Sequence, residues 1–188
     1  MSGRPLIRLV TALLGLLLPL AFLQATTASP AAAEPTVQVR TIYYDASQAG
    51  QFVNTIHSAA SIWNSRVPNI RLVSGSPASI RVYVDSGWPR AYVQGLGRGY
   101  FYMGMQAVNQ GYYPLRIATH EMGHLLGLPD RRTGLCSDLM SGSSAPVSCT
   151  NAQPSAAEAS RVNQLFAGSM AADVPTGVWF SEAPLRVG

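Results

Sequence analysis

One stretch decides the fold of this chain: His120-Glu121-Met122-Gly123-His124-Leu125-Leu126-Gly127-Leu128-Pro129-Asp130. His120 and His124 are four residues apart, so on a helix their imidazoles lie on one face and can bind one metal ion. Glu121 lies about 100° round the helix from His120, where its carboxylate can reach a water molecule on that metal. The pattern predicts a helical metal site with a general base beside the two ligands.

The residues after His124 predict how this helix ends. Gly127 is typical of a helix C-terminus in the left-handed conformation, and Pro129 prevents the helix from resuming. Asp130 then comes from a loop and can supply a third ligand, which leaves a fourth position open for water, as in catalytic zinc sites. Structural zinc is the alternative, but it is usually closed by four side chains in which cysteine is prominent, and no fourth candidate is adjacent.

The N-terminus has the pattern of a secretory signal. Arg4 and Arg8 precede an apolar run from Leu9 to Leu23, and Ala- and Ser-rich sequence follows. We expect a signal peptide at residues 1–33, cleaved between 28 and 33, and a secreted, extracellular protein. A retained N-terminal anchor is the alternative, although the run is short for a membrane span.

Composition predicts one domain and argues against a nucleic-acid partner. Of the 188 residues, 47% are hydrophobic and 12% are charged, with a net charge of +4. The length permits a single core. Removal of Arg4 and Arg8 with the signal leaves 11 arginines against nine acidic residues, which is too weak and scattered a charge for nucleic acid. We expect a monomer with no membrane contact after signal removal.

The elements before the metal motif predict an α+β fold. A first strand at 37–44 is followed by an amphipathic helix at 47–66, which Pro68 ends. Four short strands come next, at Ile70–Val73, Ser79–Asp85, Ala91–Val93 and Tyr100–Met103. This order predicts a mixed, mainly parallel twisted sheet with an antiparallel edge strand, packed on helices.

The segments after the motif predict a cross-linked loop. Pro114 suits the start of the metal-binding helix, which carries a buried apolar stripe. Cys136 and Cys149 lie in the irregular stretch that follows, and in an exported protein a lone pair of cysteines most simply forms a disulfide. Two free thiols are the alternative.

The last helix bears on the choice of the third ligand. Ser155 and Glu158 have the spacing of a capping box at its start. Glu158 is also the glutamate that another zinc-peptidase plan would use as its third ligand, but the capping role explains it without a metal. Residues 168–188 show no periodicity and are expected to be a tail, in which Val178-Trp179-Phe180 can dock on the domain.

The motif resembles that of the snapalysins, small neutral zinc endopeptidases of the metzincin clan. Metzincins share His-Glu-x-x-His-x-x-Gly-x-x-His, and the snapalysins carry Asp at the last position. Similarity extends over about 36–167, and the segments that carry it are Ile62-Trp63-Asn64-Ser65, Gly97-Arg98-Gly99-Tyr100, Cys136-Ser137-Asp138-Leu139-Met140-Ser141-Gly142 and Ser148-Cys149-Thr150-Asn151.

The resemblance implies a role for each site residue. It implies zinc bound by His120, His124 and Asp130, Glu121 as the general base on the zinc-bound water, and a metzincin-like catalytic domain. It also implies a disulfide between Cys136 and Cys149 and a Met-turn under the zinc at Met140.

The chain departs from the family pattern at two places. The family's calcium site has an Asp and a Thr where this chain has Tyr113 and Leu115, whose side chains are not usual calcium ligands, so calcium is doubtful. No tyrosine follows Met140 to steady the oxyanion, as some metzincins have.

These observations predict a secreted zinc endopeptidase that acts on proteins or peptides. The family implies a preference for an aromatic residue just after the cleaved bond. We expect the substrate to add as a strand to a sheet edge near Tyr100 to Met103. The alternatives are a secreted binding module with a vestigial zinc site and a zinc hydrolase acting on other esters or amides.

Overall fold

The computed structural model describes residues 38–168 and 174–183. The predicted signal peptide at 1–33 lies outside the described residues, as do parts of the predicted tail. The helices are α1 (Val53–Arg66), α2 (Met105–Asn109), α3 (Pro114–Leu125) and α4 (Ala156–Phe166), with 3₁₀ turns η1 (Gly50–Phe52) and η2 (Leu139–Ser144). The strands are β1 (Arg40–Gln48), β2 (Ile70–Ser74), β3 (Ile80–Tyr83), β4 (Arg90–Gly95), β5 (Arg98–Tyr102) and β6 (Val178–Ser181).

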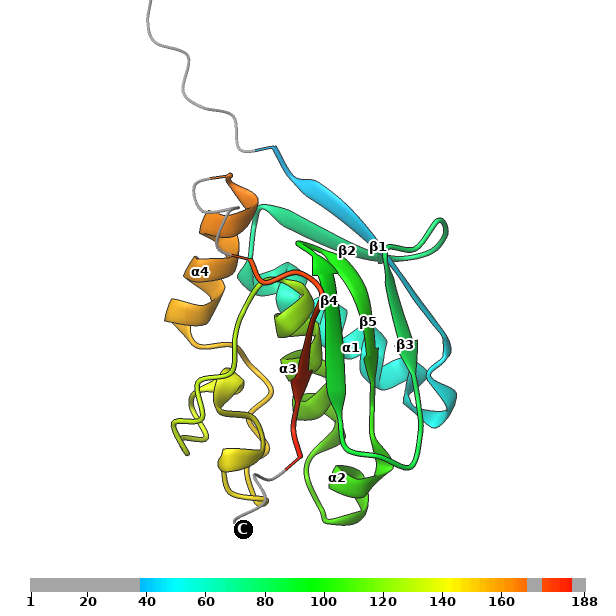
Figure 1. The fold of residues 1–188 in the computed structure, drawn as a ribbon. Coiled ribbons are helices and arrows are strands. Elements are labelled where there is room, and N and C mark those ends of the chain that lie inside the picture. Colours follow the sequence, from blue (N-terminus) through cyan, green and yellow to red (C-terminus); the bar gives the residue numbers. More distant parts are fainter. Residues whose placement is uncertain (1–37, 169–173, 184–188) are drawn as a thin grey trace, which may run out of the picture. The chain divides into compact units, whose positions relative to one another are not determined.

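The strands form one six-stranded sheet in the order β2-β1-β3-β5-β4-β6 (Figure 1). Strand β1 pairs in parallel with β2 and β3, and β3 pairs in parallel with β5. Strand β4 runs antiparallel to both of its neighbours, β5 and β6. The predicted α+β class, with a mainly parallel sheet and antiparallel pairing at one side, is confirmed.

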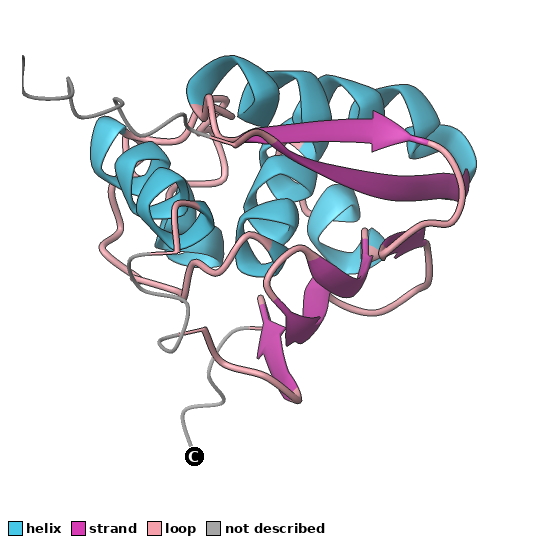
Figure 2. Cartoon of the chain, turned by 90° about the horizontal axis from the view of Figure 1, so that it is seen from above, coloured by secondary structure: helices cyan, strands magenta, loops and turns pink. Residues whose placement is uncertain are grey.

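Helices α1 and α3 pack against the sheet and against each other (Figure 2). Helix α1 covers β1 and β2, and α3 covers β4 and β5. Trp63 of α1 is fully buried and donates a hydrogen bond of 3.0 Å from Nε1 to the carbonyl oxygen of Thr119, one residue before the motif. Helix α3, which carries the motif, is therefore held from behind by the core. No helix in the described ranges is long and apolar enough to cross a membrane.

The sequence interpretation was wrong about the sheet edge. The predicted strand near Tyr100 to Met103 is β5, which lies between β3 and β4 and has no free edge. The edge nearest the motif is that of β4, and β6 from the C-terminal segment pairs with it. The sequence between Tyr100 and Pro114 shows no hydrophobic periodicity, so the short helix α2 was not predicted. Strand β6 was not predicted either.

The first strand also extends beyond its predicted end. Pairing with β3 continues from Tyr44 through Asp45 to Gln48, so a strand replaces the predicted helix start at Ser47. The chain then passes through η1 before α1 begins at Val53. A cross-strand ladder has overridden the local preference for a turn.

Gly99 allows the sheet and the metal-binding helix to approach each other. It has φ of 145° in β5, and a Cβ there would overlap the carbonyl oxygen of Tyr92 and lie 2.8 Å from Cδ2 of Leu125 in α3. Gly95 in the same hairpin has a similar φ of 157°, but a Cβ there would meet nothing within 4 Å. Of the two, only Gly99 therefore combines backbone strain with a collision.

We predict that Gly99→Ala lowers the free energy of unfolding by about 1–3 kcal/mol more than Gly95→Ala, because overpacking adds this cost to the strain that both variants share. Urea unfolding of the two purified variants measures the difference. Equal losses would mean that the contact between β5 and α3 tolerates a methyl group.

Candidate metal centre

Helix α3 presents the two histidines as the sequence predicts. It begins with Pro114 in its first turn and ends at Leu125, and Gly127 follows with a φ of 95°. Both imidazoles are buried, and their Nε2 atoms lie 3.0 Å apart. Two nitrogen atoms at this separation can share one cation.

Backbone carbonyl groups fix the orientation of both imidazoles. Nδ1 of His120 donates to the carbonyl oxygen of Leu139 at 3.0 Å, and Nδ1 of His124 donates to that of Leu128 at 2.8 Å. Because a carbonyl only accepts, Nδ1 carries a proton in each ring, and Nε2 of each ring is the atom that faces the partner histidine. Such outer partners are typical of histidines that bind metal.

Asp130 reaches the same point from the loop after α3. Its Oδ1 lies 3.4 Å from Nε2 of His120 and 3.6 Å from Nε2 of His124. Its Oδ2 accepts a hydrogen bond of 3.0 Å from Arg132. One carboxylate oxygen is thereby held by the protein, and the other faces the two imidazoles.

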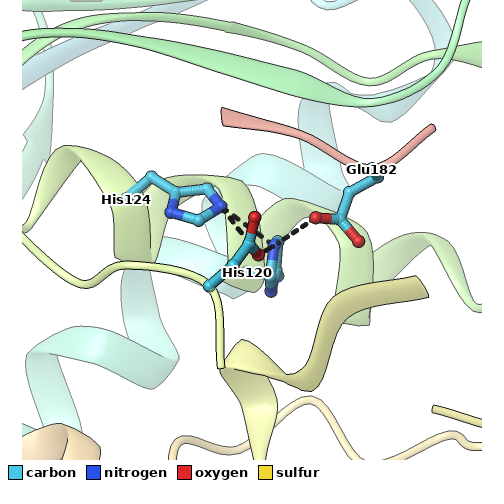
Figure 3. Close-up of side chains that lie close together, drawn as sticks. His120, His124 and Glu182 are labelled. Atoms are coloured by element: carbon cyan, nitrogen blue, oxygen red, sulfur yellow. Dashed lines mark hydrogen bonds and ion pairs between the residues drawn. The ribbon is translucent and has the colours of Figure 1, made fainter. Parts of the chain in front are cut away.

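Glu182 is a fourth residue at this point, and sequence reasoning missed it. Its Oε1 lies 3.0 Å from Nε2 of His120, although it follows that residue by 62 positions. One ligand atom from each of His120, His124, Asp130 and Glu182 lies within 4.8 Å of the others. Figure 3 shows both imidazoles and the Glu182 carboxylate converging, the carboxylate from the C-terminal segment and the imidazoles from α3.

The donor set fits a divalent cation. Two imidazole nitrogens and carboxylate oxygens are usual zinc ligands. Glu121 is fully buried beside them, and neither of its carboxylate oxygens has a hydrogen-bond partner among the described residues. The same is true of Oδ1 of Asp130. Buried carboxylate oxygens without donors are costly unless a cation or a water molecule satisfies them.

The buried charges shift the pKa values at the centre strongly. Burial, with the charge on His120, lowers the pKa of His124 to about 3. Burial acts in the same sense on His120, but Glu182 and Asp130 outweigh it and hold its pKa well above the usual value. Burial also raises the pKa of Glu121 well above that of an exposed carboxyl. A raised pKa suits a carboxylate that must accept a proton near neutral pH.

Met140 packs against α3 at Gly123, between the two histidines. It is fully buried in η2, and a Cβ on Gly123 of α3 would lie 2.8 Å from its Sδ. A side chain at position 123 would therefore collide with η2. The sequence alone would have identified Met140 only as a loop residue.

Arg116 and the disulfide hold the loop between α3 and α4. The buried Arg116 donates to four backbone carbonyl oxygens, those of Cys136, Asp138, Leu139 and Asn151. Cys136 and Cys149 form the predicted disulfide in the same loop. Leu139, whose carbonyl orients His120, is therefore fixed by a residue of α3 itself.

Glu158 has the capping role that the sequence predicts. Ser155 Oγ accepts from Glu158 N at 3.3 Å, and Glu158 Oε2 accepts from Ser155 N at 2.6 Å. Its carboxylate also accepts from the backbone N–H groups of Leu139 and Met140, at 3.2 and 2.7 Å. These contacts direct the carboxylate to the base of η2, and it is not part of the metal group.

A pocket opens beside His120. It has a volume of about 340 Å³ including its open side. Its lining is mostly apolar and comes from Pro89, Ala107, Tyr112, Tyr113, Arg116, Ile117, His120, Gly142, Ser143 and Glu182. The pocket therefore offers a mostly apolar surface next to the metal group.

Comparison with known proteins identifies the family. The model of the Streptomyces extracellular neutral proteinase (M7) family matches residues 39–169. The chain belongs to this family. An extracellular small neutral protease of Streptomyces coelicolor is 48% identical over 143 residues, which are 74% of this chain and 66% of the relative. One of Streptomyces caespitosus is 47% identical over 129 residues, which are 68% of this chain and 97% of the relative.

The family match covers only part of the metal group. His120, His124 and Asp130 lie inside it, and Glu182 lies beyond its end at residue 169. The chain spans about two thirds of the length of the relatives from Streptomyces coelicolor and from Streptomyces sp. (strain C5). The strand β6 and Glu182 are therefore additions to what the family model describes.

We predict that Glu158→Gln destabilises the fold but leaves metal binding intact. The amide replaces a charged acceptor of buried N–H groups, which costs about 2 kcal/mol. Thermal unfolding should show a melting temperature lower by roughly 4–8 °C. Ser160→Ala, an exposed change in the same helix, serves as the control. Loss of zinc from a folded Glu158→Gln protein would instead identify Glu158 as a ligand.

Proposed function

We propose that the chain is a secreted zinc-dependent endopeptidase that hydrolyses peptide bonds in proteins. The observation that carries this proposal is the convergence of His120, His124 and Asp130 on one point, with the buried Glu121 beside it. Membership of a family of extracellular neutral proteinases supports the same activity and location. The proposed substrate is a protein or an unfolded peptide.

The proposed mechanism gives each residue one task. His120, His124 and Asp130 would hold the zinc ion, and Met140 would support the base of the site. A bound zinc ion supplies Lewis acidity, which polarises water and the scissile carbonyl. Glu121 accepts the proton of the attacking water and delivers it to the leaving amine. The burial that raises its pKa favours the first of these transfers.

The pocket beside His120 supports the proposed preference for an aromatic residue after the cleaved bond. Ile117 and Ala107 give it apolar walls, and Tyr112 and Tyr113 offer ring contacts. Burying an aromatic side chain in such a pocket is worth about 1.5–3 kcal/mol relative to leaving it exposed. The pocket adjoins the metal group through His120, so the residue that fills it lies next to the scissile bond.

We predict that Glu121→Gln retains zinc but loses proteolysis. Removal of a general base should lower kcat/KM about 10²- to 10⁴-fold. Casein cleavage and zinc content, measured on the same preparation, test this. Asp130→Ala is the contrasting variant and should lose zinc affinity as well. Proteolysis that survives in zinc-loaded Glu121→Gln would contradict the role.

We further predict that peptides with Phe or Tyr after the cleaved bond are cleaved at least about tenfold faster, by kcat/KM, than matched peptides with Ala. Ala107→Leu fills the pocket and should reduce this ratio. Asn109→Leu adds the same side chain on the exposed side of α2 and should leave the ratio unchanged. Mass spectrometry of a peptide library reads the preference directly. An unchanged ratio in Ala107→Leu would place the specificity pocket elsewhere.

A further inference from the structure

The C-terminal segment covers the sheet edge beside the metal group. Strand β6 pairs antiparallel with β4 in the register Val93 with Val178 to Arg90 with Ser181. Hydrogen bonds from Gly177 N to Val93 O and from Glu182 N to Pro89 O extend the pairing at both ends. A peptide that adds as a strand to β4 would need this same row of backbone groups. The other edge strand of the sheet is β2, at the far end of the strand order.

The side chains of the segment face the metal group. Alternation along the strand sends Phe180 and Glu182 to the same side. The ring of Phe180 stacks on the imidazole of His124 with a centroid separation of 4.2 Å and an interplanar angle of 6°. Trp179 points to the other side and packs on Tyr92 and Tyr100. The segment is thus held on both faces of the sheet.

Hydrogen-bond donors of the protein surround the Glu182 carboxylate and balance its negative charge. Its Oε2 accepts a hydrogen bond of 3.0 Å from Arg132 and another from the N–H group of Ser143. A Cβ on Gly142 would collide with this carboxylate. Only 5% of Glu182 is exposed, and Oε1 is the atom left to face His120 and the metal position.

Arg132 ties the segment to the metal-binding loop. It donates to Glu182, to Asp130, to the hydroxyl of Ser143 and to the carbonyl oxygen of Ser181. It is the one non-glycine residue with positive φ, 49°, among the described residues. Strained backbone of this kind persists where the surroundings over-determine it. Here the surroundings include the C-terminal segment itself.

We propose that residues 177–182 are an autoinhibitory strand, with Glu182 as the fourth protein ligand of the metal. This proposal rests on the proposed peptidase function. The strand takes the substrate's place on β4, and the Glu182 carboxylate takes the coordination position that an attacking water needs. The strand is not cut, because a side-chain carboxylate and not a peptide carbonyl faces the metal position. The closed chain is therefore a stable, inactive form.

An intramolecular competitor has a distinctive kinetic effect. It reduces the fraction of chains that can bind substrate, so it raises the apparent KM by the reciprocal of that fraction and leaves kcat unchanged. Covalent attachment keeps its effective concentration on the order of millimolar. If the strand is closed in nine chains out of ten or more, releasing it lowers KM at least about tenfold.

The experiment compares zinc-loaded full-length wild type, Glu182→Gln and Phe180→Ala on one fluorogenic peptide. Both variants should show KM at least about tenfold below that of wild type, with kcat unchanged. Ser181→Ala, an exposed neighbour whose side chain points away from the metal group, should behave as wild type. A synthetic peptide of residues 174–183 should inhibit Glu182→Gln competitively.

Two measurements test the ligand role without relying on cleavage. In the Co²⁺-substituted protein, visible absorption reports the number and type of ligands, so Glu182→Gln should change the spectrum and Ser181→Ala should not. Hydrogen exchange at the amides of Gly177 and Glu182 should be slow in wild type and accelerate in Glu182→Gln and Phe180→Ala.

The outcomes separate the two proposals. Equal KM values and equal cobalt spectra in wild type and Glu182→Gln would overturn autoinhibition while leaving the peptidase function standing. If no variant cleaves any peptide, the peptidase function fails, and an altered cobalt spectrum with faster exchange would still support Glu182 as a ligand. A higher KM or a lower kcat in both variants would show that the segment supports the site and does not block it.

Discussion

Two imidazole Nε2 atoms held 3.0 Å apart are the constraint on which the rest of the structure depends. The carbonyl oxygens of Leu139 and Leu128 impose this arrangement, because each accepts the proton of an Nδ1 atom. Such a pair is favourable only if a cation lies between the lone pairs or one nitrogen takes a proton. The raised pKa of His120 and the lowered pKa of His124 correspond to a proton on one of the two nitrogens. The carboxylates of Asp130 and Glu182 at the same point suit the other option, a cation between the nitrogens.

The loop that orients His120 is held by buried charges from two helices. Arg116 of α3 binds its carbonyl oxygens, and Glu158 of α4 binds its N–H groups at Leu139 and Met140. Each charge is costly to bury, and each is satisfied by several backbone partners. Burial lowers the pKa of Arg116, and Glu158, Asp138 and Glu182 oppose that effect. Arg116 and Glu158 thus hold the loop against the helix that carries the two histidines.

Local signals predicted most of the fold and the core of the site. The His120 and His124 spacing, the helix end at Gly127 and the capping box at Glu158 all depend on residues within a few positions of each other, and the structure has each of them. The prediction of a free sheet edge near Tyr100 to Met103 was wrong, because edges are set by which strands meet across the whole sheet. Glu182 was missed because its partner lies 62 residues away and β6 is too short to show a period. The features that the sequence did not predict all depend on contacts between residues far apart in the chain, and they lie where the C-terminal segment meets the metal group.

The burial of Glu182 links metal binding to closure of the strand. Burial alone would raise its pKa, but His120 and Arg132 lower it, so the carboxylate stays charged in the closed form. A divalent cation at the same point would attract that charge more strongly than a single imidazolium does. Thermodynamic coupling is reciprocal: if the closed strand strengthens metal binding by a given free energy, the bound metal stabilises the closed strand by the same amount. Under the proposed autoinhibition, the zinc-loaded chain would be the most tightly closed, and a substrate would have to displace a ligand as well as a strand to reach Glu121.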